Sequence, residues 1–422
     1  MKFIVNGGKK LKGEITVGGS KNAALPILAA TLLTKRTCVI KNVPHIGDVL
    51  VMLELFESMG SEIEWLDENT LKIRNENLDP TKISKTLTRK IRSSILLIGP
   101  LLARFKEVKI NTPGGCHIGI RPMDAHFDLF KDLGFDIKYN EQKDLYSITK
   151  SKKKGFKHVT LKEFSVTATE NLLLFGSKNP LSVSIAATEP HVQDLGRFLI
   201  KLGAKIDGLG THDIQIKKTI SETGGEVRHT IVSDYIEAGT FMILGAATSS
   251  DITIKKVPVD DLVLPIQKLK EFGVKLEIKG NTVKVLGSKS KLKAVSKIKT
   301  EPYPGFPSDL QAPFAVLATQ ATGETLIFES MYEGRLKYLY ELDKMGASVS
   351  ILDTHRARIL GPKKLKGKNV ESLDLRAGAT LIIAALVAQG ESVLHEADRV
   401  DRGYEKIEER LKTLGAQIKR EG

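Results

Sequence analysis

The segment from Pro113 to Asp124 combines glycine, proline and cysteine in a pattern that could carry chemistry. It reads Pro-Gly-Gly-Cys-His-Ile-Gly-Ile-Arg-Pro-Met-Asp, and Cys116 is one of two cysteines in the chain. Segments rich in glycine and proline form surface loops, where catalytic groups are commonly mounted. Arg121 and a protonated His117 would lower the pKa of a nearby thiol and favour the reactive thiolate. The alternative is an inert small residue in a turn, which is the commoner role of a single cysteine.

The composition predicts a globular protein without a disulfide framework. The chain has 422 residues, of which 41% are hydrophobic and 27% charged, so two or more domains are expected. Two cysteines fit a reducing compartment, which predicts a cytoplasmic location, and Cys38 lies in a strand-like run where burial is expected. No signal peptide is visible, and the longest uncharged apolar run, residues 377–390, is shorter than the ~20 residues that cross a bilayer. We therefore expect no membrane insertion.

The formal net charge of +14 allows three interpretations: a generic solvated surface, a nucleic-acid site, or a field that favours anionic small molecules. The lysine-rich run 150–154 has only Phe156 close by, whereas single-stranded nucleic acid is usually bound on several interleaved aromatic rings. A nucleic-acid partner is therefore not expected. The nine histidines do not cluster at ligand spacings, and no dinucleotide or Walker-type glycine loop is complete, so neither metal nor cofactor is expected.

The elements that would position these residues repeat along the chain. Six segments share one pattern of amphipathic helix, glycine and strand, at intervals of 69–74 residues; their glycines are Gly60, Gly134, Gly203, Gly273, Gly346 and Gly415. Each glycine is expected in the left-handed conformation just after a helix. The period exceeds the ~20–50 residues of solenoid repeats. Six units split most simply into three plus three, which predicts a boundary near residues 222–226.

Each unit also contains an apolar segment, expected to form a buried helix, and short β-branched strands. The expected helices are 20–33, 88–102, 165–176, 233–247, 307–319 and 374–389, and the expected strands are 37–40, 71–73, 108–110, 181–185, 252–254, 325–328 and 392–395. Charged residues gather at the helix starts, among them Lys21, Arg92 and Arg376. Capping explains serine, threonine and aspartate there. It does not explain cations, which the helix dipole disfavours, so an anionic ligand beside them is predicted.

Six short motifs resemble those of the enolpyruvyl transferases in order and spacing. They are residues 18–24, 91–95, 113–124, 303–311, 374–377 and 401–405, and the resemblance spans essentially the whole chain. It is closest to the members that use UDP-N-acetylglucosamine in the first committed step of peptidoglycan synthesis, because members that act on shikimate phosphate are not expected to carry the Cys116 loop. The resemblance implies an α/β fold of two inside-out, barrel-like domains, each a three-fold repeat, with the active site in the cleft between them. The implied domains are residues 22–232 and residues 1–21 plus 233–422.

The implied reaction transfers the enolpyruvyl group of phosphoenolpyruvate to the 3′-hydroxyl of UDP-N-acetylglucosamine by addition and elimination, releasing phosphate. It needs a proton donor for the methylene carbon, a base for the sugar hydroxyl and cations for the phosphate and carboxylate. The resemblance implies that Cys116 donates the proton and forms a covalent adduct with phosphoenolpyruvate, that the same thiol opens the epoxide ring of fosfomycin, and that Asp309 is the base. The residues implied to bind phosphoenolpyruvate are Lys21, Asn22, Arg121, Arg376 and Arg402.

The resemblance also implies a nucleotide site and two supporting acids, Asp374 and Glu189. The implied nucleotide contacts are Arg92, Arg121, Pro122, Met123, Asp124, Ala125, Glu163, Phe164, Ser165, Val166, Asp309 and Met331. The chain departs from the family pattern in this loop, where residues 163–167 read Glu-Phe-Ser-Val-Thr in place of a Lys or Pro followed by Ser-Val-Gly, and Arg399 replaces a common histidine. A glutamate beside a pyrophosphate would repel it unless its side chain points to solvent. The alternative function is therefore a related transferase, or a non-catalytic paralogue, with altered nucleotide recognition. The sequence gives no basis for predicting the oligomeric state.

Overall fold

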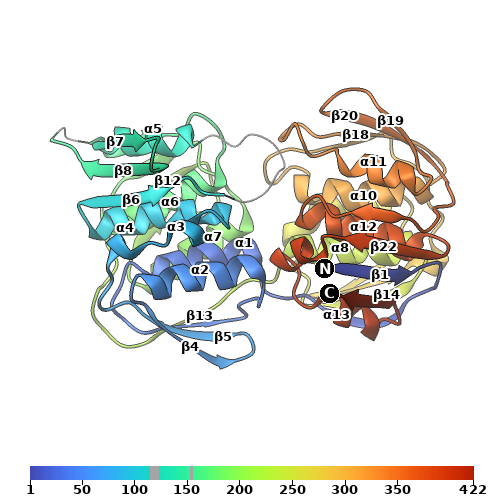
Figure 1. Cartoon of the computed structure of the whole chain (residues 1–422), viewed down its shortest axis with the longest axis horizontal. Coiled ribbons are helices and arrows are strands. Elements are labelled where there is room, and N and C mark those ends of the chain that lie inside the picture. Colours follow the sequence, from blue (N-terminus) through green and yellow to red (C-terminus); the bar gives the residue numbers. More distant parts are fainter. Residues whose placement is uncertain (115–122, 153–154) are drawn as a thin grey trace. The chain divides into compact units, whose positions relative to one another are not determined.

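The structure is a computed structural model that describes residues 1–114, 123–152 and 155–422 (Figure 1). The described chain divides into two compact units, which are treated separately below. Unit 1 consists of Met1–Gly18 and Ser233–Gly422, and unit 2 consists of the described residues from Gly19 to Val232. Cys116, Arg121 and Pro122, which were singled out in the sequence, lie outside the described residues.

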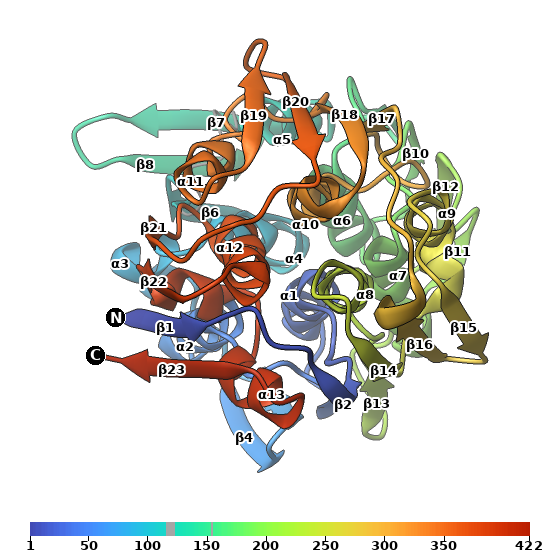
Figure 2. The ribbon, with the colours of Figure 1, turned by 90° about the vertical axis from the view of Figure 1, so that its right-hand side faces the viewer.

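Unit 1 consists of three four-stranded sheets arranged around three buried helices. The sheets are β21 (Asn369–Glu371), β22 (Glu391–His395), β1 (Lys2–Asn6) and β23 (Gln417–Glu421); β15 (Leu276–Lys279), β16 (Thr282–Leu286), β14 (Asp251–Lys255) and β2 (Lys12–Thr16); and β17 (Lys297–Lys299), β18 (Gly323–Phe328), β20 (Arg356–Gly361) and β19 (Ser348–Ile351). The inner helices are α8 (Tyr235–Ala247), α10 (Ser308–Gln320) and α12 (Leu375–Val387). These helices pack against one another, and Figure 2 shows the strands of this unit around them. Helices that are apolar on every side need such an interior position.

Unit 2 repeats this plan with two four-stranded sheets and one three-stranded sheet. The sheets are β13 (Val227–Thr230), β3 (Cys38–Lys41), β5 (Thr70–Arg74) and β4 (Glu62–Asp67); β11 (Lys205–Asp207), β12 (Asp213–Lys218), β10 (Ser182–Ser184) and β9 (His158–Thr160); and β6 (Glu107–Asn111), β8 (Leu145–Lys150) and β7 (Phe135–Asn140). The inner helices are α1 (Lys21–Thr31), α6 (Val166–Gly176) and the pair η2 (Arg92–Leu97) and α4 (Ile98–Arg104). The α/β fold of two three-fold repeats inferred from the resemblance is confirmed.

The three-stranded sheet has a short helical segment where the other five sheets have a fourth strand. In those five sheets one edge strand runs parallel to its neighbour, as β9 does to β10. In the third sheet of unit 2, η1 (Pro80–Lys82) contacts β6 instead. Proline has no backbone N–H and cannot complete a ladder, which favours the irregular segment.

The outer helices end at the six glycines predicted to mark the repeats. These helices are α2 (Gly47–Ser58), α5 (Asp124–Asp132), α7 (Pro190–Lys201), α9 (Val263–Glu271), α11 (Tyr338–Lys344) and α13 (Ile407–Thr413), and the remaining short elements are α3 (Lys85–Thr88), η3 (Val259–Leu262), η4 (Gly287–Lys289) and η5 (Ala397–Arg402). All six glycines have φ between +82° and +110°, which confirms the predicted left-handed position after each helix. The boundary expected near residues 222–226 is wrong, because β13 follows it and pairs with β3 of unit 2.

Five of the six predicted inner helices are present, and the one expected over residues 88–102 is wrong in its extent. The chain there ends α3 at Thr88, runs as the 3₁₀ segment η2 and enters α4 only at Ile98. Pro100 lies in the first turn of α4, where a missing N–H is tolerated; a continuous α-helix would place its ring against the carbonyl of Leu96. All seven predicted strands are present.

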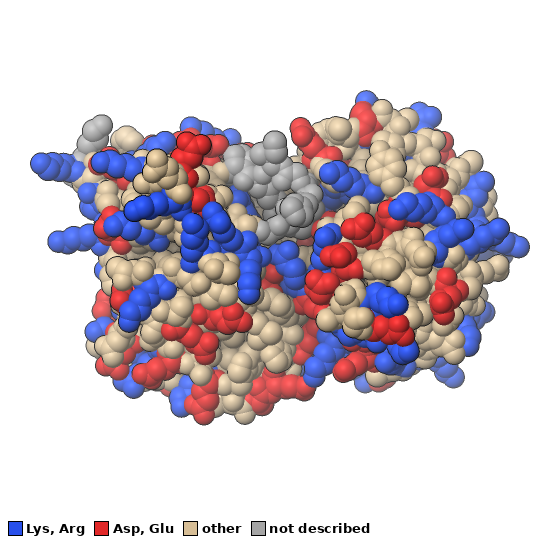
Figure 3. Space-filling model, viewed as in Figure 1, with Lys and Arg blue, Asp and Glu red and all other residues tan. Residues whose placement is uncertain are grey.

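The second cysteine is buried as expected, and Figure 3 shows the charged side chains on one face of the surface. Basic and acidic side chains are interspersed on the face shown in Figure 3, as on a solvated surface. Cys38 is fully buried, and burial raises the pKa of its thiol to about 12, so the thiol is unreactive. Among the described residues, no helix is both long and apolar enough to cross a membrane.

Candidate functional site

In unit 1, the carboxylate of Asp309 lies between two arginines. Asp309 is the second residue of α10; Arg335 Nη2 donates to its Oδ1, and Arg376 Nε donates to its Oδ2 at 3.1 Å. The arginine side chains are only 7% and 5% exposed, whereas that of Asp309 is 26% exposed. Helix capping is the alternative role for an aspartate at this position. That alternative is wrong, because Pro307 occupies the N-cap and the carboxylate faces the arginines.

Arg376 keeps one donor for a ligand. It is the second residue of α12, whose N-cap Asp374 accepts the Arg376 backbone N–H at 2.7 Å. Its Nη1 is buried and has no hydrogen-bond partner among the described residues. Burial alone would lower the pKa of Arg376, but Tyr404, Asp309 and Asp234 raise it, so the guanidinium stays charged. A buried charged donor of this kind is suited to an anionic group.

Arg335 is a contact of Asp309 in unit 1 that the sequence did not reveal. Its Nη1 donates to Ser308 Oγ at 3.2 Å, and that hydroxyl donates to Glu329 Oε2 at 2.6 Å. The other carboxylate oxygen of Glu329 accepts the backbone N–H of Met331 at 2.9 Å. An arginine after a glycine in a loop is a common pattern, so nothing in the sequence distinguished Arg335 from a surface residue.

Arg402 ends η5, which packs against α12. A surface pair with the neighbouring Asp401 is the alternative role for an arginine at this position. In the structure the Asp401 carboxylate receives both Nη atoms of Arg420, each at 2.7 Å, so it already has a partner. Arg399, which stands where a histidine is common in the family, donates to the carbonyl of Ser372 at 2.8 Å and so fixes the loop before Asp374.

In unit 2, Lys21 and Asn22 are the first two residues of α1. Lys21 Nζ lies 2.7 Å from Asp48 Oδ2, and their side chains are 12% and 6% exposed. Ser20 is the N-cap, and Gly19 before it has no room for a side chain, because a Cβ would lie 1.8 Å from the carbonyl oxygen of Asn42. Asp48 was not predicted from the sequence, because its distance from Lys21 along the chain gives no indication that the two side chains meet. The protein itself therefore supplies a negative charge, that of Asp48, next to the Lys21 cation at this helix start.

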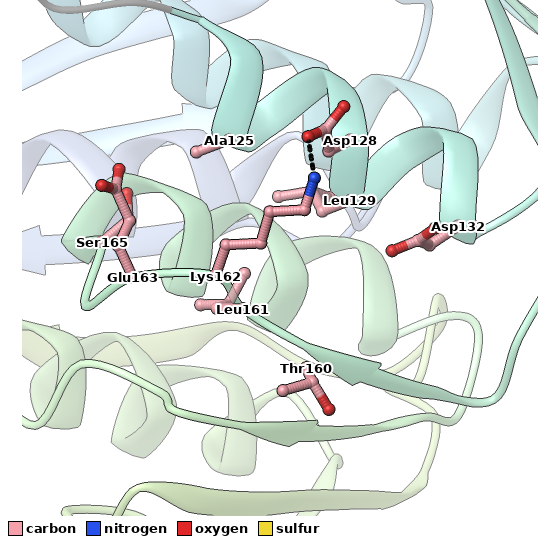
Figure 4. A pocket seen from close by; sticks show the side chains of 9 residues that line it. All are labelled: Ala125, Asp128, Leu129, Asp132, Thr160, Leu161, Lys162, Glu163 and Ser165. Atoms are coloured by element: carbon pink, nitrogen blue, oxygen red, sulfur yellow. Dashed lines mark hydrogen bonds and ion pairs between the residues drawn. The ribbon is translucent and has the colours of Figure 1, made fainter.

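The predicted nucleotide residues of unit 2 lie at the starts of η2, α5 and α6. Arg92 is the first residue of η2, Met123 is the N-cap of α5 and is followed by Asp124 and Ala125, and Ser165 caps α6. A pocket between α5 and the loop before α6 is lined by Ala125, Asp128, Leu129, Asp132, Thr160, Leu161, Lys162, Glu163 and Ser165 (Figure 4). Three predicted nucleotide residues therefore share one pocket, and Lys162 reaches Asp128 inside it at 2.5 Å.

The same loop presents an aromatic ring. Phe164 is 46% exposed, and its ring centroid lies 4.8 Å from that of His212. Val166 begins α6, so the loop residues Glu163 to Ser165 are held between β9 and this helix. An exposed ring at this position could stack on a base.

His126 is a further buried group behind the nucleotide residues that the sequence did not indicate. Its Nδ1 lies 3.3 Å from Asn171 Nδ2, and its Nε2 lies 3.0 Å from Thr167 Oγ1. Burial, with a smaller contribution from Arg92, lowers the pKa of His126 to about 3. The imidazole is therefore neutral and braces the α5 and α6 starts.

The predicted supporting acid Glu189 occupies the N-cap position of α7 without a capping hydrogen bond. Glu170 on α6 is buried, and both burial and the charge of Glu189 raise the pKa of its carboxyl group. Within the part of the chain that the structure describes, no group of three or more histidine, cysteine or acidic side chains could hold a metal ion.

Comparison with known proteins identifies the family of the chain. The family model for EPSP synthase (3-phosphoshikimate 1-carboxyvinyltransferase) matches residues 5–411. The UDP-N-acetylglucosamine 1-carboxyvinyltransferase of Helicobacter pylori is 40% identical over 100% of this chain and 99% of that protein, and UDP-N-acetylglucosamine 1-carboxyvinyltransferase 1 of Carboxydothermus hydrogenoformans is 43% identical over 99% and 98%. The chain belongs to the EPSP synthase family of enolpyruvyl transferases, which confirms the resemblance.

A solved structure shows the same fold at lower identity. The enolpyruvyl transferase NikO from Streptomyces tendae matches with a TM-score of 0.87 and 23% identity, over 99% of this chain and 98% of that one. At this identity the likeness supports the fold alone.

Proposed function

We propose that the chain transfers the enolpyruvyl group of phosphoenolpyruvate to the 3′-hydroxyl of UDP-N-acetylglucosamine, in the first committed step of peptidoglycan synthesis. The observation that carries this proposal is the similarity, over the full chain, to relatives named for that reaction. An acceptor other than UDP-N-acetylglucosamine is not favoured, because both relatives are named for that acceptor. A cytoplasmic location is proposed with it, because both substrates are metabolites of that compartment.

The proposed reaction has two steps. The sugar hydroxyl adds to C2 of phosphoenolpyruvate as the hydroxyl proton passes to Asp309 and C3 takes a proton from Cys116. C3 then gives up a proton to the Cys116 thiolate left by the first step, and the C3–H electron pair forms the new double bond. The bond from C2 to the phosphate oxygen breaks, and phosphate leaves with the electron pair of that bond. The product is an enolpyruvyl ether.

The substrate's phosphate and carboxylate need cations, which we assign to Lys21, Arg121, Arg376 and Arg402, with Asn22 beside them. The buried Nη1 of Arg376 supports this assignment, because it is a donor aimed at no protein group among the described residues. Asp374 supports it by fixing the backbone of Arg376. The residues assigned to the reaction come from both units, which we propose are the two enolpyruvyl transferase domains. Their first boundary lies between residues 18 and 19, a few residues before the division into 1–21 and 22–232 that the resemblance implied.

Asp309 can act as the base despite its two arginine partners. Each carboxylate oxygen has two lone pairs, so an oxygen that accepts a guanidinium N–H can also accept the sugar hydroxyl. Its partial exposure leaves it reachable, while the arginines are buried.

We assign the nucleotide to Arg92, Arg121–Ala125, Glu163–Val166, Asp309 and Met331. The pocket shared by Ala125, Glu163 and Ser165 supports this assignment in unit 2. The exposed ring of Phe164 is suited to the uracil base. Glu189 is retained as a supporting acid near the sugar.

The test is phosphate release from phosphoenolpyruvate with UDP-N-acetylglucosamine, with shikimate 3-phosphate, or with no acceptor. We expect release only with the nucleotide sugar, and mass spectrometry should show that sugar enlarged by one enolpyruvyl group. Release only with shikimate 3-phosphate would assign the chain to the other branch of the family. No release with either acceptor would support the non-catalytic alternative.

A further inference from the structure

We infer that Arg420 is a positioning residue of the transfer reaction: it binds Asp401 and thereby holds η5, the short segment that ends at Arg402. This role rests on the proposed assignment of Arg402 to phosphoenolpyruvate and adds a residue to the proposed function. Arg420 lies in β23, the last strand, outside the six motifs of the sequence. Its two acidic partners, Asp401 and Glu408, lie on either side of Arg402 along the chain.

The guanidinium group of Arg420 uses all three of its nitrogens on these two carboxylates. Its Nη1 and Nη2 donate to the two oxygens of Asp401, each at 2.7 Å. Its Nε and Nη2 donate to the two oxygens of Glu408, the latter at 2.9 Å. Paired donors of this kind define the position of a carboxylate more closely than a single contact does. A lysine could not form both pairs, because an ammonium group has no planar fork.

The guanidinium group is also held from the side of the sheet. Phe3 on β1 lies opposite Arg420 in the register of β1 and β23, and the centroid of its ring is 4.7 Å from Arg420 Cζ. Phe3 is fully buried. The side chains of Arg420 and Asp401 are 27% and 34% exposed, so water screens their attraction only in part. Arg420 therefore extends from a fixed strand and can restrain the segment that it contacts.

Three consecutive residues of η5 are held before the segment reaches Arg402. Arg399 donates to a carbonyl group in the loop before α12. Val400 is fully buried, and η5 packs against α12. Asp401 is bound by Arg420. The backbone that leads into Arg402 is thus restrained at three points, and Arg420 provides the one that directly precedes Arg402.

The alternative is a purely structural role, in which Arg420 ties the last strand to α13 through Glu408. Loss of Arg420 would then lower stability without a selective effect on one substrate. The two acids distinguish these roles, because both contact the same guanidinium group but only Asp401 adjoins Arg402. The two substrates also distinguish them, because Arg402 is assigned to phosphoenolpyruvate alone.

The positioning role predicts a selective loss in Arg420→Gln. A displacement of Arg402 by less than about 1 Å should lower kcat/KM for phosphoenolpyruvate by about 10-fold. The KM for UDP-N-acetylglucosamine should stay within about 2-fold of the wild-type value. Arg420→Lys keeps the charge without the fork, so it should recover only part of the loss. Phosphate release measures all three quantities, and an unchanged kcat/KM for phosphoenolpyruvate in Arg420→Gln would contradict the inference.

The sharpest comparison is between Asp401→Asn and Glu408→Gln, since each variant removes one carboxylate from Arg420. Asp401→Asn should reproduce most of the kinetic loss of Arg420→Gln, and amide hydrogens of η5 should exchange faster in it than in the wild type. Glu408→Gln should lower the melting temperature but keep kcat/KM for phosphoenolpyruvate within about 2-fold. Equal kinetic losses in the two variants would mean that Arg420 is a structural anchor, and the inference would be wrong.

A double-mutant cycle tests whether Arg420 acts through Arg402. In the Arg402→Gln background, Arg420→Gln should change kcat/KM for phosphoenolpyruvate by less than about 2-fold, because the group that it positions is absent. Equal losses in both backgrounds would overturn the inference.

The matched control is Arg410→Gln. Arg410 is also an arginine of unit 1 that pairs with a carboxylate, that of Glu237, and its Cζ lies 5.1 Å from the centroid of the Phe241 ring, but the proposed site does not include it. This variant should lower thermal stability and leave kcat/KM for phosphoenolpyruvate unchanged. If Arg420→Gln behaves in the same way, its effect is structural and the inference fails.

A variant that does not fold would leave the inference testable. If Arg420→Gln is unfolded, the comparison of Asp401→Asn with Glu408→Gln decides by the same two outcomes. A wild-type protein that releases no phosphate would count against the proposed function. An active wild type whose Arg420→Gln variant keeps its full kcat/KM would count against the positioning role alone, so the two failures are distinguishable.

Discussion

The two units place a cation at the start of an inner helix in different ways. In unit 1, Arg376 at α12 donates to Asp309 through Nε, and its Nη1 has no hydrogen-bond partner among the described residues. In unit 2, Lys21 at α1 lies against Asp48, which supplies a buried carboxylate for its charge. A cation that opposes the helix dipole is therefore weak support for a ligand by itself, because the protein can provide the anion. Stronger support for a ligand comes from Nη1 of Arg376, a buried donor for which the described part of the chain provides no partner.

Among the variants that test this comparison, one that lacks the Arg376 guanidinium should lose the most activity. Arg376→Gln deletes the spare donor and leaves Asp309 with one arginine, so kcat/KM for phosphoenolpyruvate should fall by about 10³-fold, equivalent to roughly 4 kcal/mol. The measurement is phosphate release against phosphoenolpyruvate concentration, with Arg410→Gln as the control for the loss of a buried arginine. A fall of less than about 10-fold would show that Nη1 does not face the substrate.

Lys21→Gln should have the next largest effect. A lysine is a point charge without a bidentate fork, so we expect kcat/KM for phosphoenolpyruvate to fall by about 10²-fold, less than for Arg376→Gln. Asp48→Asn should cost about 10-fold or less, because the amide still orients the ammonium group. Equal losses in the two variants, together with a lower melting temperature in both, would mean that the pair is structural.

The repeat pattern explains why so much of the fold was predictable. Six glycines after helices need a left-handed backbone, and a local requirement of that kind is visible in the sequence. The prediction of one helix over 88–102 was wrong because the apolar pattern continues past Thr88 and Pro100. The backbone leaves the α-helical conformation after Thr88 and resumes it only at Ile98. Periodicity reports which face is buried and says less about where a helix is interrupted.

The site was predictable to a lesser degree, for a physical reason. Resemblance supplied Asp309, Arg376 and Lys21, which occur in short motifs. Their partners Arg335 and Asp48 come from other elements, 26 and 27 residues away along the chain. Pairing across that distance depends on how the elements pack, which composition and spacing do not specify.

A third prediction concerns acid and applies to unit 2, whose inner helices are braced by the neutral His126. The pKa of His126 is about 3 in the folded chain and is expected near 6.5 when unfolded, so the unfolded state takes up the proton first as the pH falls. Stability is therefore lost from about pH 6.5 downward, by about 2 kcal/mol at pH 5. Denaturant unfolding of the wild type and His126→Gln at both pH values should show this extra loss only in the wild type. An equal loss in both proteins would assign the acid sensitivity elsewhere. The arginines of the unit 1 cluster stay charged throughout that range.

The smallest expected effect concerns Glu163 in the loop before α6, where the chain departs from the family pattern. The side chain is exposed and lines the pocket with Ser165 and Ala125. If a pyrophosphate binds there, Glu163→Lys exchanges repulsion for attraction, and the KM for UDP-N-acetylglucosamine should fall about 3- to 10-fold at low salt, an effect near 1 kcal/mol that salt should diminish. The KM for phosphoenolpyruvate should stay within about 2-fold, because that substrate is assigned to other residues. Glu64→Lys, at a 60% exposed carboxylate on β4, controls for the change in net charge. A nucleotide KM that falls equally in both variants would reflect long-range attraction alone, and one that moves in neither would mean that Glu163 faces solvent and that the altered loop leaves nucleotide recognition unchanged.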